Sequence, residues 1–412
     1  MTMKTTKWLL AGVAATAAIA LAGCSPASGG GGSTSGSGKL TMLIGSSGDA
    51  ETKAVQDAAS AWGKKNSTTV DVVAASDLNQ QLSQGFAGDD APDLFYMGWD
   101  QFDTYAANGY LQPYAKDLAN KGDFIDTLTK TFTYDKTFTC APKDFSTLGL
   151  IINTGMWQAA GLTDADVPKD WDGLEAVAKK LTTGGAVGLS FGLEYARVGV
   201  FMNQAGGTIV DGDKVKADSK ENLAGLDYVK KLHDEGVLKF PSEIDSGWSG
   251  EALGKGKAAM VIEGPWIKGI QGDYPDTKYA AYELPKGPDK SSTFSFTNCW
   301  GIPKGGDNAA KAQSLVEFLT SDDQQMAFAD AFGVIPSTTA ASKTYADKYP
   351  ENASFVASAD YAVSPVKFDG AATVITDFNS QLEGLATGAD PEAMLKSFQT
   401  ELQSALDEAN GK

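Results

Sequence analysis

"KLTMLIGSSGDAETKAVQDAASAWGKKNSTTVDVVAAS", residues 39–76, is the stretch that decides the fold class of this chain. It begins with a short apolar run, residues 39–45, and ends with a second one, residues 68–76. Between them, residues 49–65 repeat apolar side chains at the spacing of an amphipathic helix. A strand, a helix and a second strand in this order predict a βαβ unit with parallel strands, so we expect an α/β fold.

The same alternation continues along the chain. A helix is expected over residues 77–88, a strand over 92–98 and a helix over 100–109. The pattern also predicts helices over residues 170–181, 223–236 and 309–320, and an almost wholly helical C-terminal stretch over 371–409. Single cores stop growing at about 250–300 residues, so we expect two domains in this chain.

The N-terminus has the pattern of an export signal. Lys4 and Lys7 precede an apolar run that ends at Gly23 and is too short to span a bilayer, which takes about 20 residues. The sequence Leu-Ala-Gly-Cys that ends at Cys24 resembles the lipobox of bacterial lipoproteins. This resemblance implies a signal peptide over residues 1–23 and acylation of Cys24, followed by a flexible Gly/Ser tether that reaches residue 38. The alternative is an ordinary thiol at Cys24 after an ordinary signal peptide.

Composition and charge exclude several classes of function. A formal net charge of −18 without a basic stripe argues against nucleic acid as a partner. One histidine and no zinc-ligand spacing leave no sign of a metal, a cofactor or a histidine-based hydrolase. A secreted, lipid-anchored glycosidase remains the alternative, because counting residues cannot exclude a carboxylate pair among 52 acidic residues.

A large aromatic residue is expected at the end of one strand. In "KGKAAMVIEGPWIKGI", residues 255–270, an apolar run leads into Gly264-Pro265-Trp266. Pro265 cannot donate a hydrogen bond to a neighbouring strand, so the strand should end just before the indole.

Seven segments occur in the order seen in one known family. They are "APDLFYMGWDQFDTYAANGYLQPY", "APKDFSTLGLIINTGMW", "VPKDWDGLEAVAKKL", Gly206-Gly207, "LGKGKAAMVIEGPW", "NCWGIPKG" and "GVIPSTTAA". Together they resemble the extracellular solute-binding proteins of bacterial carbohydrate ABC importers, of the maltose-binding-protein-like type. The resemblance implies a periplasmic-binding-protein fold, with two α/β lobes, a ligand cleft between them and crossing hinge strands. The implied boundaries are residues 39–143 and 301–335 for lobe 1, 146–297 and 338–412 for lobe 2, and a hinge near 140–146, 297–301 and 335–338.

The resemblance also implies a set of ligand-binding residues. Trp266 is expected to stack on the apolar face of a sugar ring. Carboxylates that bind sugar hydroxyls are expected at Asp100, Asp144 and Glu194, with further contacts from Tyr195, Trp99, Trp248 and Trp300. Weaker candidates at the first two helix starts are Ser47, Asp49, Asp77 and Gln80, for which capping or turn formation is an equally good interpretation.

Cys140 and Cys299 are the cysteines that remain once Cys24 is acylated. An even pair in an exported chain is more often a disulfide than two free thiols. The resemblance places both residues on segments that cross side by side between the lobes, which implies a Cys140–Cys299 bond. Two buried thiols are the alternative.

These observations predict a binding protein rather than an enzyme. We expect it to capture an oligosaccharide, such as a malto- or xylo-oligosaccharide, and to deliver it to the transmembrane subunits of an ABC permease. It should act as a monomer at the extracellular face of the cytoplasmic membrane, held there by its lipid anchor alone and without a cofactor.

Overall fold

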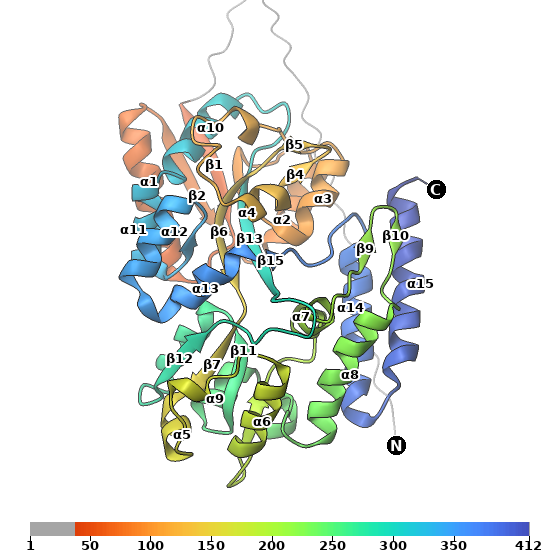
Figure 1. Ribbon diagram of the computed structural model, residues 1–412. Helices are drawn as coiled ribbons and strands as arrows, with labels where there is room; N and C mark the ends of the chain where they lie inside the picture. The colour runs from red at the N-terminus through yellow and green to blue at the C-terminus, as the bar shows by residue number, and fades with distance from the viewer. Residues whose placement is uncertain (1–37, 412) are drawn as a thin grey trace, which may run out of the picture. The chain divides into compact units, whose positions relative to one another are not determined.

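Seven strands form the larger of two sheets in the computed structural model, which describes residues 38–411 (Figure 1). The strands are β1 (Lys39–Ile44), β2 (Thr69–Ala74), β3 (Leu94–Gly98), β6 (Ala141–Thr147), β13 (Thr293–Gly301), β14 (Ile335–Pro336) and β15 (Ala362–Val363). β1 pairs in parallel with β2 and β3, and α1 (Asp49–Lys65) connects β1 to β2, so the predicted βαβ unit is confirmed. Cys24, the signal peptide and nearly all of the tether lie outside the described residues.

Four strands form the second sheet, in the order β12-β7-β11-β8. Their bounds are β7 (Gly149–Asn153), β8 (Val187–Ser190), β11 (Ala258–Glu263) and β12 (Tyr279–Tyr282). β11 pairs in parallel with β8 and antiparallel to β7, so this sheet is mixed. Two short hairpins stand apart from both sheets: β4 (Thr133–Tyr134) with β5 (Thr137–Phe138), and β9 (Val210–Asp211) with β10 (Lys214–Val215).

Helices cover both sheets. After α1 come α2 (Leu78–Ala87), α3 (Trp99–Ala107), α4 (Asp126–Thr131), α5 (Thr154–Ala159), α6 (Trp171–Leu181), α7 (Tyr195–Gln204), α8 (Lys220–Asp234), α9 (Ser249–Gly254), α10 (Ala309–Leu319), α11 (Asp322–Phe332), α12 (Thr339–Lys348), α13 (Ala353–Ala357), α14 (Ala371–Leu382) and α15 (Pro391–Ala409). Short 3-10 helices are η1 (Ala115–Asp117), η2 (Asp164–Asp166), η3 (Pro241–Ile244), η4 (Pro265–Gln271), η5 (Pro350–Asn352), η6 (Ser358–Asp360) and η7 (Glu383–Thr387). The alternation of strands and helices predicted over residues 39–109 is confirmed.

β6 and β13 connect the two sheets. They pair antiparallel to each other, and the chain passes from β6 into β7 of the smaller sheet through the single residue Leu148. Each sheet has its own buried core, and Figure 1 shows the larger sheet above the smaller one. The chain therefore has the two-lobe α/β fold with strands that cross between the lobes. The exact lobe boundaries stay a prediction.

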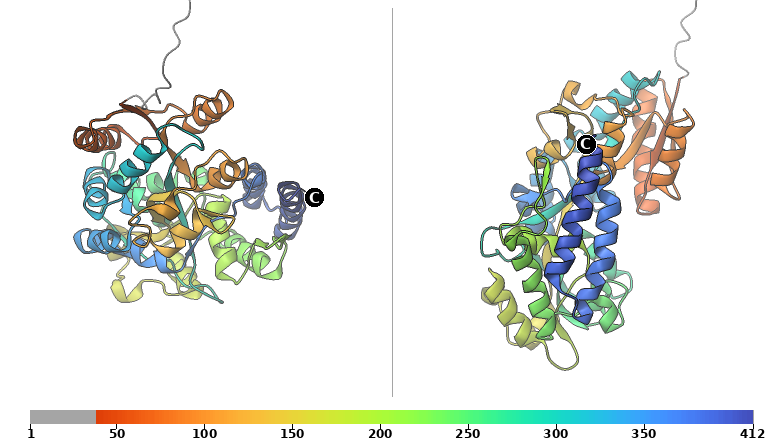
Figure 2. Two further views of the ribbon diagram at one scale, coloured as in Figure 1. Left: turned by 90° about the horizontal axis from the view of Figure 1, so that it is seen from above. Right: turned by 90° about the vertical axis from the view of Figure 1, so that its right-hand side faces the viewer.

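The C-terminal helices belong to the core of the smaller lobe. The rings of Phe378 on α14 and Phe398 on α15 stack with centroids 4.1 Å apart. The right-hand view of Figure 2 shows these two helices running side by side. Their apolar faces meet each other and α8, which explains the nearly continuous helical pattern in the sequence.

A disulfide joins Cys140 to Cys299. Cys299 lies on β13, and Cys140 immediately precedes β6, so the bond links the two strands that connect the lobes. Both residues are buried, with 1% and 0% of their surface exposed. The two bonded cysteines are 159 residues apart in the sequence.

We expect that replacing both cysteines by serine lowers the free energy of unfolding by up to ~5 kcal/mol, because the unfolded chain loses a long cross-link. Urea denaturation of the wild type and of the Cys140→Ser, Cys299→Ser variant measures this difference. Alkylation of the denatured protein without reductant, followed by intact mass measurement, tests the bond itself. Two added labels on the mature protein would contradict it.

Candidate functional site

Trp266 stands where β11 ends. The strand stops at Glu263 and η4 begins at Pro265, as the proline predicted. The indole is 40% exposed, a large fraction for a tryptophan, and its Nε1–H donates a hydrogen bond of 2.8 Å to Glu263 Oε2. Trp266 is therefore an exposed aromatic surface in a fixed orientation.

Gly264 leaves the space in which the indole lies. A Cβ atom at this position would come within 2.3 Å of Trp266 Cζ3, closer than two carbon atoms can approach. The φ angle of Gly264 is −97°, which any residue can adopt, so close approach rather than backbone conformation requires glycine here.

Glu263 is a buried acceptor for three neighbours. Besides the bond from Trp266, it accepts a hydrogen bond of 2.7 Å from Arg197 and one of 2.5 Å from Ser249 Oγ. Arg197 also pairs with Glu194, and its guanidinium lies 5.8 Å from the Trp266 ring centroid. Each oxygen of Glu263 thus has partners, as a carboxylate that is only 2% exposed requires.

Trp266 lines two hollows. One, here called the Asp144 hollow, has a volume of about 620 Å³ and is lined by Asp100, Asp144, Trp99 and Trp266 among others. The second, here called the Glu194 hollow, has a volume of about 840 Å³ and is lined by Glu194, Trp248 and Trp266 among others. Both linings include Trp266, so the indole stands at the boundary between the two hollows, which together are called the cleft here.

Three aromatic side chains follow one another through the Asp144 hollow. Phe296 lies between Trp99 and Trp266, with ring centroids 6.2 Å and 6.3 Å away. Phe296 and Asn298 are alternate residues of β13, and the side-chain amide of Asn298 donates to Asp144 Oδ1 at 3.3 Å. Apolar and carboxylate groups therefore line the same cavity.

A buried ion cluster holds Asp144 in place. Lys143 pairs with Asp144 and, at 3.1 Å, with Glu51. Burial disfavours the charged form of Glu51, but Lys143 and two hydrogen bonds from Ser47 hold the pKa of its carboxyl group below its usual value. Burial likewise disfavours the ammonium of Lys143, yet Asp144, Tyr96 and Glu51 raise the pKa of Lys143. This wall of the hollow is charged and rigid.

The structure brings together most of the residues that the sequence singled out. The Asp144 hollow contains Ser47, Trp99, Asp100, Asp144 and Trp266. The Glu194 hollow adds Glu194 and Trp248, whose indole is 37% exposed.

The three remaining candidates at helix starts line neither hollow. Asp77 accepts a hydrogen bond from the backbone N–H of Gln80 and caps α2, which was the alternative interpretation of this residue. Asp49 and Gln80 are exposed.

Trp300 is not in the cleft, which corrects the expectation that it contacts a ligand. It is 1% exposed, and its ring packs edge-on against Tyr96 with centroids 5.0 Å apart. At Trp300 β13 is paired with both β3 and β6, and the indole belongs to the buried core of the larger lobe.

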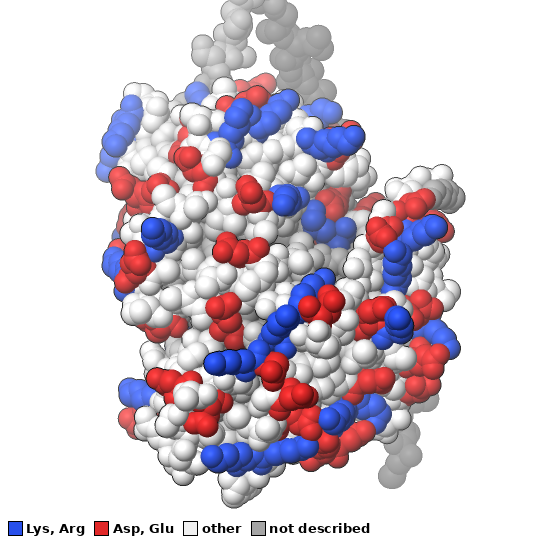
Figure 3. All heavy atoms as spheres, viewed as in Figure 1, with Lys and Arg blue, Asp and Glu red and all other residues white. Residues whose placement is uncertain are grey.

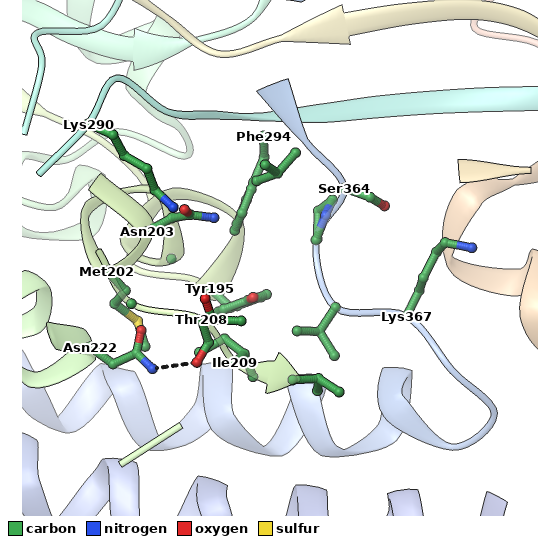
Figure 4. Close-up of a pocket in the computed structure, with 16 residues that line it drawn as sticks. Tyr195, Met202, Asn203, Thr208, Ile209, Asn222, Lys290, Phe294, Ser364 and Lys367 are labelled. Carbon is green, nitrogen blue, oxygen red and sulfur yellow. Dashed lines mark hydrogen bonds between the residues drawn. The ribbon is translucent and has the colours of Figure 1, made fainter. Parts of the chain in front are cut away.

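Tyr195 lies in a separate pocket of about 380 Å³ (Figure 4), which corrects the expectation that it contacts the ligand. It is 3% exposed, and its ring lies 5.4 Å from the Phe294 ring and 6.0 Å from the Phe398 ring. Glu194, one residue earlier, faces the cleft, so the first turn of α7 sends the neighbouring side chain into the core.

Sequence reasoning missed four residues that shape the site. Glu263, Arg197, Phe296 and Asn298 line the two hollows. Glu263 directly precedes the Gly-Pro-Trp motif, and an acidic residue at the end of an otherwise apolar strand was a usable signal. A second usable signal was the placement of Phe296 and Asn298 at alternate positions of one strand, just before Cys299.

Charges of both signs are mixed on the visible face of the molecule (Figure 3). On the face shown in Figure 3, Asp and Glu are spread among Lys and Arg without a continuous basic stripe. Within residues 38–411, His, Cys, Asp and Glu form no group that could hold a metal ion. In the same part of the chain, every helix is too short or too polar to cross a membrane.

Comparison with known proteins gives three results. A family profile described as "Bacterial extracellular solute-binding protein" matches residues 57–357. The chain is 24% identical over 406 residues to the galactooligosaccharide-binding protein of Bacillus subtilis (strain 168), covering 92% of this chain and 93% of that relative. It is 23% identical over 319 residues to a maltooligosaccharide ABC transporter solute-binding lipoprotein of Streptococcus pneumoniae (strain ATCC BAA-255 / R6), covering 71% of each.

Among solved structures, the cyclic alpha-maltosyl-1,6-maltose binding protein from Arthrobacter globiformis has the same fold. The TM-score is 0.79 at 19% sequence identity, over 90% of this chain and 99% of that one.

Glu51→Gln should lower the free energy of unfolding at pH 7 by about 2 kcal/mol, because the acceptor of bonds from Lys143 and Ser47 becomes neutral. The pKa of Glu51 in the folded protein lies below its usual 4.5, so its contribution is complete above that pH and is lost as pH falls through the folded-state pKa. The stability difference between wild type and variant, measured by urea denaturation, should therefore shrink on acidification below about pH 4.5. A constant difference would contradict this role.

Gly264→Ala should displace the indole of Trp266, because the added Cβ would overlap it. The expected result is a changed near-UV circular dichroism spectrum with a melting temperature close to that of the wild type. Gly269→Ala in the same η4 segment is the matched control, since a Cβ there meets nothing within 4 Å. Equal spectra for the two variants would show that Gly264 does not position Trp266.

Proposed function

The chain belongs to the bacterial extracellular solute-binding protein family, and from that premise we propose that it binds an oligosaccharide in the cleft between its lobes and delivers it to an ABC permease. The relatives named for galactooligosaccharides and maltooligosaccharides support a sugar as the ligand.

The single observation that carries the proposal is the exposed, fixed indole of Trp266 between two carboxylate-lined hollows. A pyranose ring presents a face of C–H groups, which a flat aromatic ring can cover with little loss of conformational entropy. Its hydroxyl groups project around the ring edge, where Asp100 and Asp144 can accept hydrogen bonds from them. Charge-assisted bonds of this kind are stronger than neutral ones.

The size of the cleft favours a chain of sugars over a single ring. The two hollows meet at Trp266, and aromatic rings follow one another from Trp99 through Phe296 to Trp266. Repeated flat surfaces suit a ligand with repeated ring faces. Malto- and xylo-oligosaccharides are the candidates that we propose to test first.

The charges in the cleft favour a neutral ligand. Carboxylates line both hollows at Asp100, Asp144, Glu194, Glu263 and Glu383, against the cations Arg197 and Lys268. Arg197 is already occupied by two of these carboxylates. An anionic sugar, such as a uronic acid, would meet an excess of negative charge and should bind poorly.

We further propose that acylation of Cys24 holds the protein at the outer face of the cytoplasmic membrane as a monomer. Several acyl chains on one cysteine would anchor it stably, whereas a single chain holds only marginally. The Gly/Ser-rich segment up to residue 38 would then allow the folded body to move between free ligand and permease.

Binding is tested by titrating the mature protein with neutral di- to hexasaccharides, using calorimetry and tryptophan fluorescence. Chromatography of the recovered sugar separates a receptor, which returns it intact, from a glycosidase, which returns products. If no saccharide gives a heat, a fluorescence change or a shift in melting temperature, the proposal is wrong.

Trp266→Ala should remove most of the affinity through loss of apolar contact, and Asp100→Asn should cost about 1–3 kcal/mol of binding free energy. Both variants should melt cooperatively, because the two side chains face the cleft. Tyr134→Ala is the matched control, since Tyr134 is 38% exposed and lines neither hollow. Loss of cooperative melting in Trp266→Ala would assign that residue to the core instead.

A further inference from the structure

One further pocket lies outside the cleft, beside the core of the smaller lobe. It is the pocket of about 380 Å³ around Tyr195, and small-molecule sites usually measure about 300–1,000 Å³. It shares no lining residue with the Asp144 hollow or the Glu194 hollow. Its walls come from α7, the chain that leads into β9, β13 and the segment between β15 and α14. We call it the Phe294 pocket. A ligand bound there would not occupy the proposed sugar site.

Apolar side chains form much of the lining of the Phe294 pocket. Tyr195, Met202 and Phe294 belong to the buried core of the smaller lobe, and each is at most 3% exposed. Pro365 and Val366 add a second apolar wall from the segment before α14. An apolar group of about the size of a phenyl ring would be removed from water here, which favours its binding.

Two polar atoms among the lining residues have no partner. Asn203 Oδ1 and Ser364 Oγ are buried, and neither forms a hydrogen bond within residues 38–411. Buried polar atoms nearly always have a hydrogen-bond partner, so these two atoms require a group that comes from outside the chain. For the carboxamide oxygen of Asn203 this group must be a donor, either a hydroxyl or an N–H.

The charge of the lining is positive. Lys290 and Lys367 line the Phe294 pocket, whereas no Asp or Glu does. Lys367 is already paired with Asp103 at 2.9 Å. The ammonium of Lys290 forms no ion pair or hydrogen bond with any other residue that the structure describes. Lys290 can therefore bind an anionic group of a ligand.

The free cation and the free acceptor lie together. Figure 4 shows the ammonium end of Lys290 turned toward the carboxamide of Asn203. The anionic group and the donor of a ligand would therefore be neighbours in its structure. A carboxylate with a hydroxyl group on the next carbon has this arrangement, whereas the ammonium group of an amino acid would be repelled by Lys290.

We propose that the Phe294 pocket is a second ligand site, which binds a small 2-hydroxy carboxylic acid with an apolar side chain. The carboxylate pairs with Lys290, the hydroxyl donates to Asn203 Oδ1, and the apolar side chain packs on Phe294. This site goes beyond the proposed function and does not depend on it.

The test uses the full mature protein with its methionine methyl groups labelled with ¹³C, because Met202 lines the Phe294 pocket. 3-Phenyllactate is the probe, and its titration should shift the NMR signal of Met202, which Met202→Leu identifies. Met42 is the internal control, since it lies in the core of the larger lobe and its signal should not move.

Two analogues of the probe each lack one polar group. 3-Phenylpropanoate has no hydroxyl, and 3-phenyllactamide has no charge. Both should bind more weakly than 3-phenyllactate if Asn203 and Lys290 have the roles proposed here.

Matched variants test each contact. Lys290→Met should weaken binding of 3-phenyllactate about threefold, because an exposed ion pair contributes little, and should leave binding of 3-phenyllactamide unchanged. Asn203→Leu should weaken binding of 3-phenyllactate about tenfold and leave binding of 3-phenylpropanoate unchanged. If this variant does not fold, Asn203→Asp should abolish binding of both acids by repulsion between like charges. Lys286→Met is the control, since Lys286 is an exposed lysine of the same loop that does not line the pocket.

Two outcomes would overturn the second site. If 3-phenyllactate at millimolar concentration leaves the Met202 signal unchanged, or shifts the Met42 signal equally, the pocket does not bind such acids and water satisfies its polar atoms. Equal affinity for all three probes would make it an apolar cavity without a polar site, which also contradicts the inference. Neither outcome bears on the proposed function, because sugar binding is measured in the cleft and involves neither Lys290 nor Asn203.

Discussion

The antiparallel pairing of β6 with β13 is the contact on which both lobes depend. β13 lies between β6 and β3 in the larger sheet, and β6 continues through Leu148 into β7 of the smaller sheet. The disulfide of Cys140 and Cys299 fastens the same pair of strands. Because Phe296, Asn298 and Asp144 also come from these two strands, the element that joins the lobes is at the same time a wall of the cleft.

Buried carboxylates, rather than the exposed ones, determine the geometry of the cleft. Glu263 orients Trp266 and Arg197, and Glu51 fixes Lys143 beside Asp144. Each is almost fully buried and has a partner for each oxygen, so neither can rearrange without leaving polar atoms unpaired. The groups exposed to a ligand are therefore held in place before the ligand arrives, which reduces the entropy lost on binding.

The sequence was sufficient for the fold class and for the position of Trp266 at the end of a strand. Hydrophobic periodicity predicted the first βαβ units, and Pro265 predicted where β11 ends and hence that Trp266 lies outside the sheet. Trp300 and Tyr195 could not be placed in the same way, because Trp300 lies two residues after Asn298 and Tyr195 directly follows Glu194, both of which line the cleft. Whether a neighbouring side chain points inward or outward depends on where a strand enters a sheet or how a helix begins, and local patterns do not contain that information. The bond between Arg197 and Glu263 joins residues that are distant in sequence, so only the folded chain shows it.

The strand order of the larger sheet also governs when that sheet can form. β3 and β6 are built early in the chain, yet they lie on either side of β13, which ends at Gly301. Until residues 293–301 have been synthesised, both strands have an unpaired edge facing an empty position. Pairing across such a large sequence separation is slow, since the intervening chain must first be closed into a loop. A nascent chain of this protein thus stays incompletely folded for most of its synthesis, which is the condition in which a polypeptide can still be threaded through a membrane.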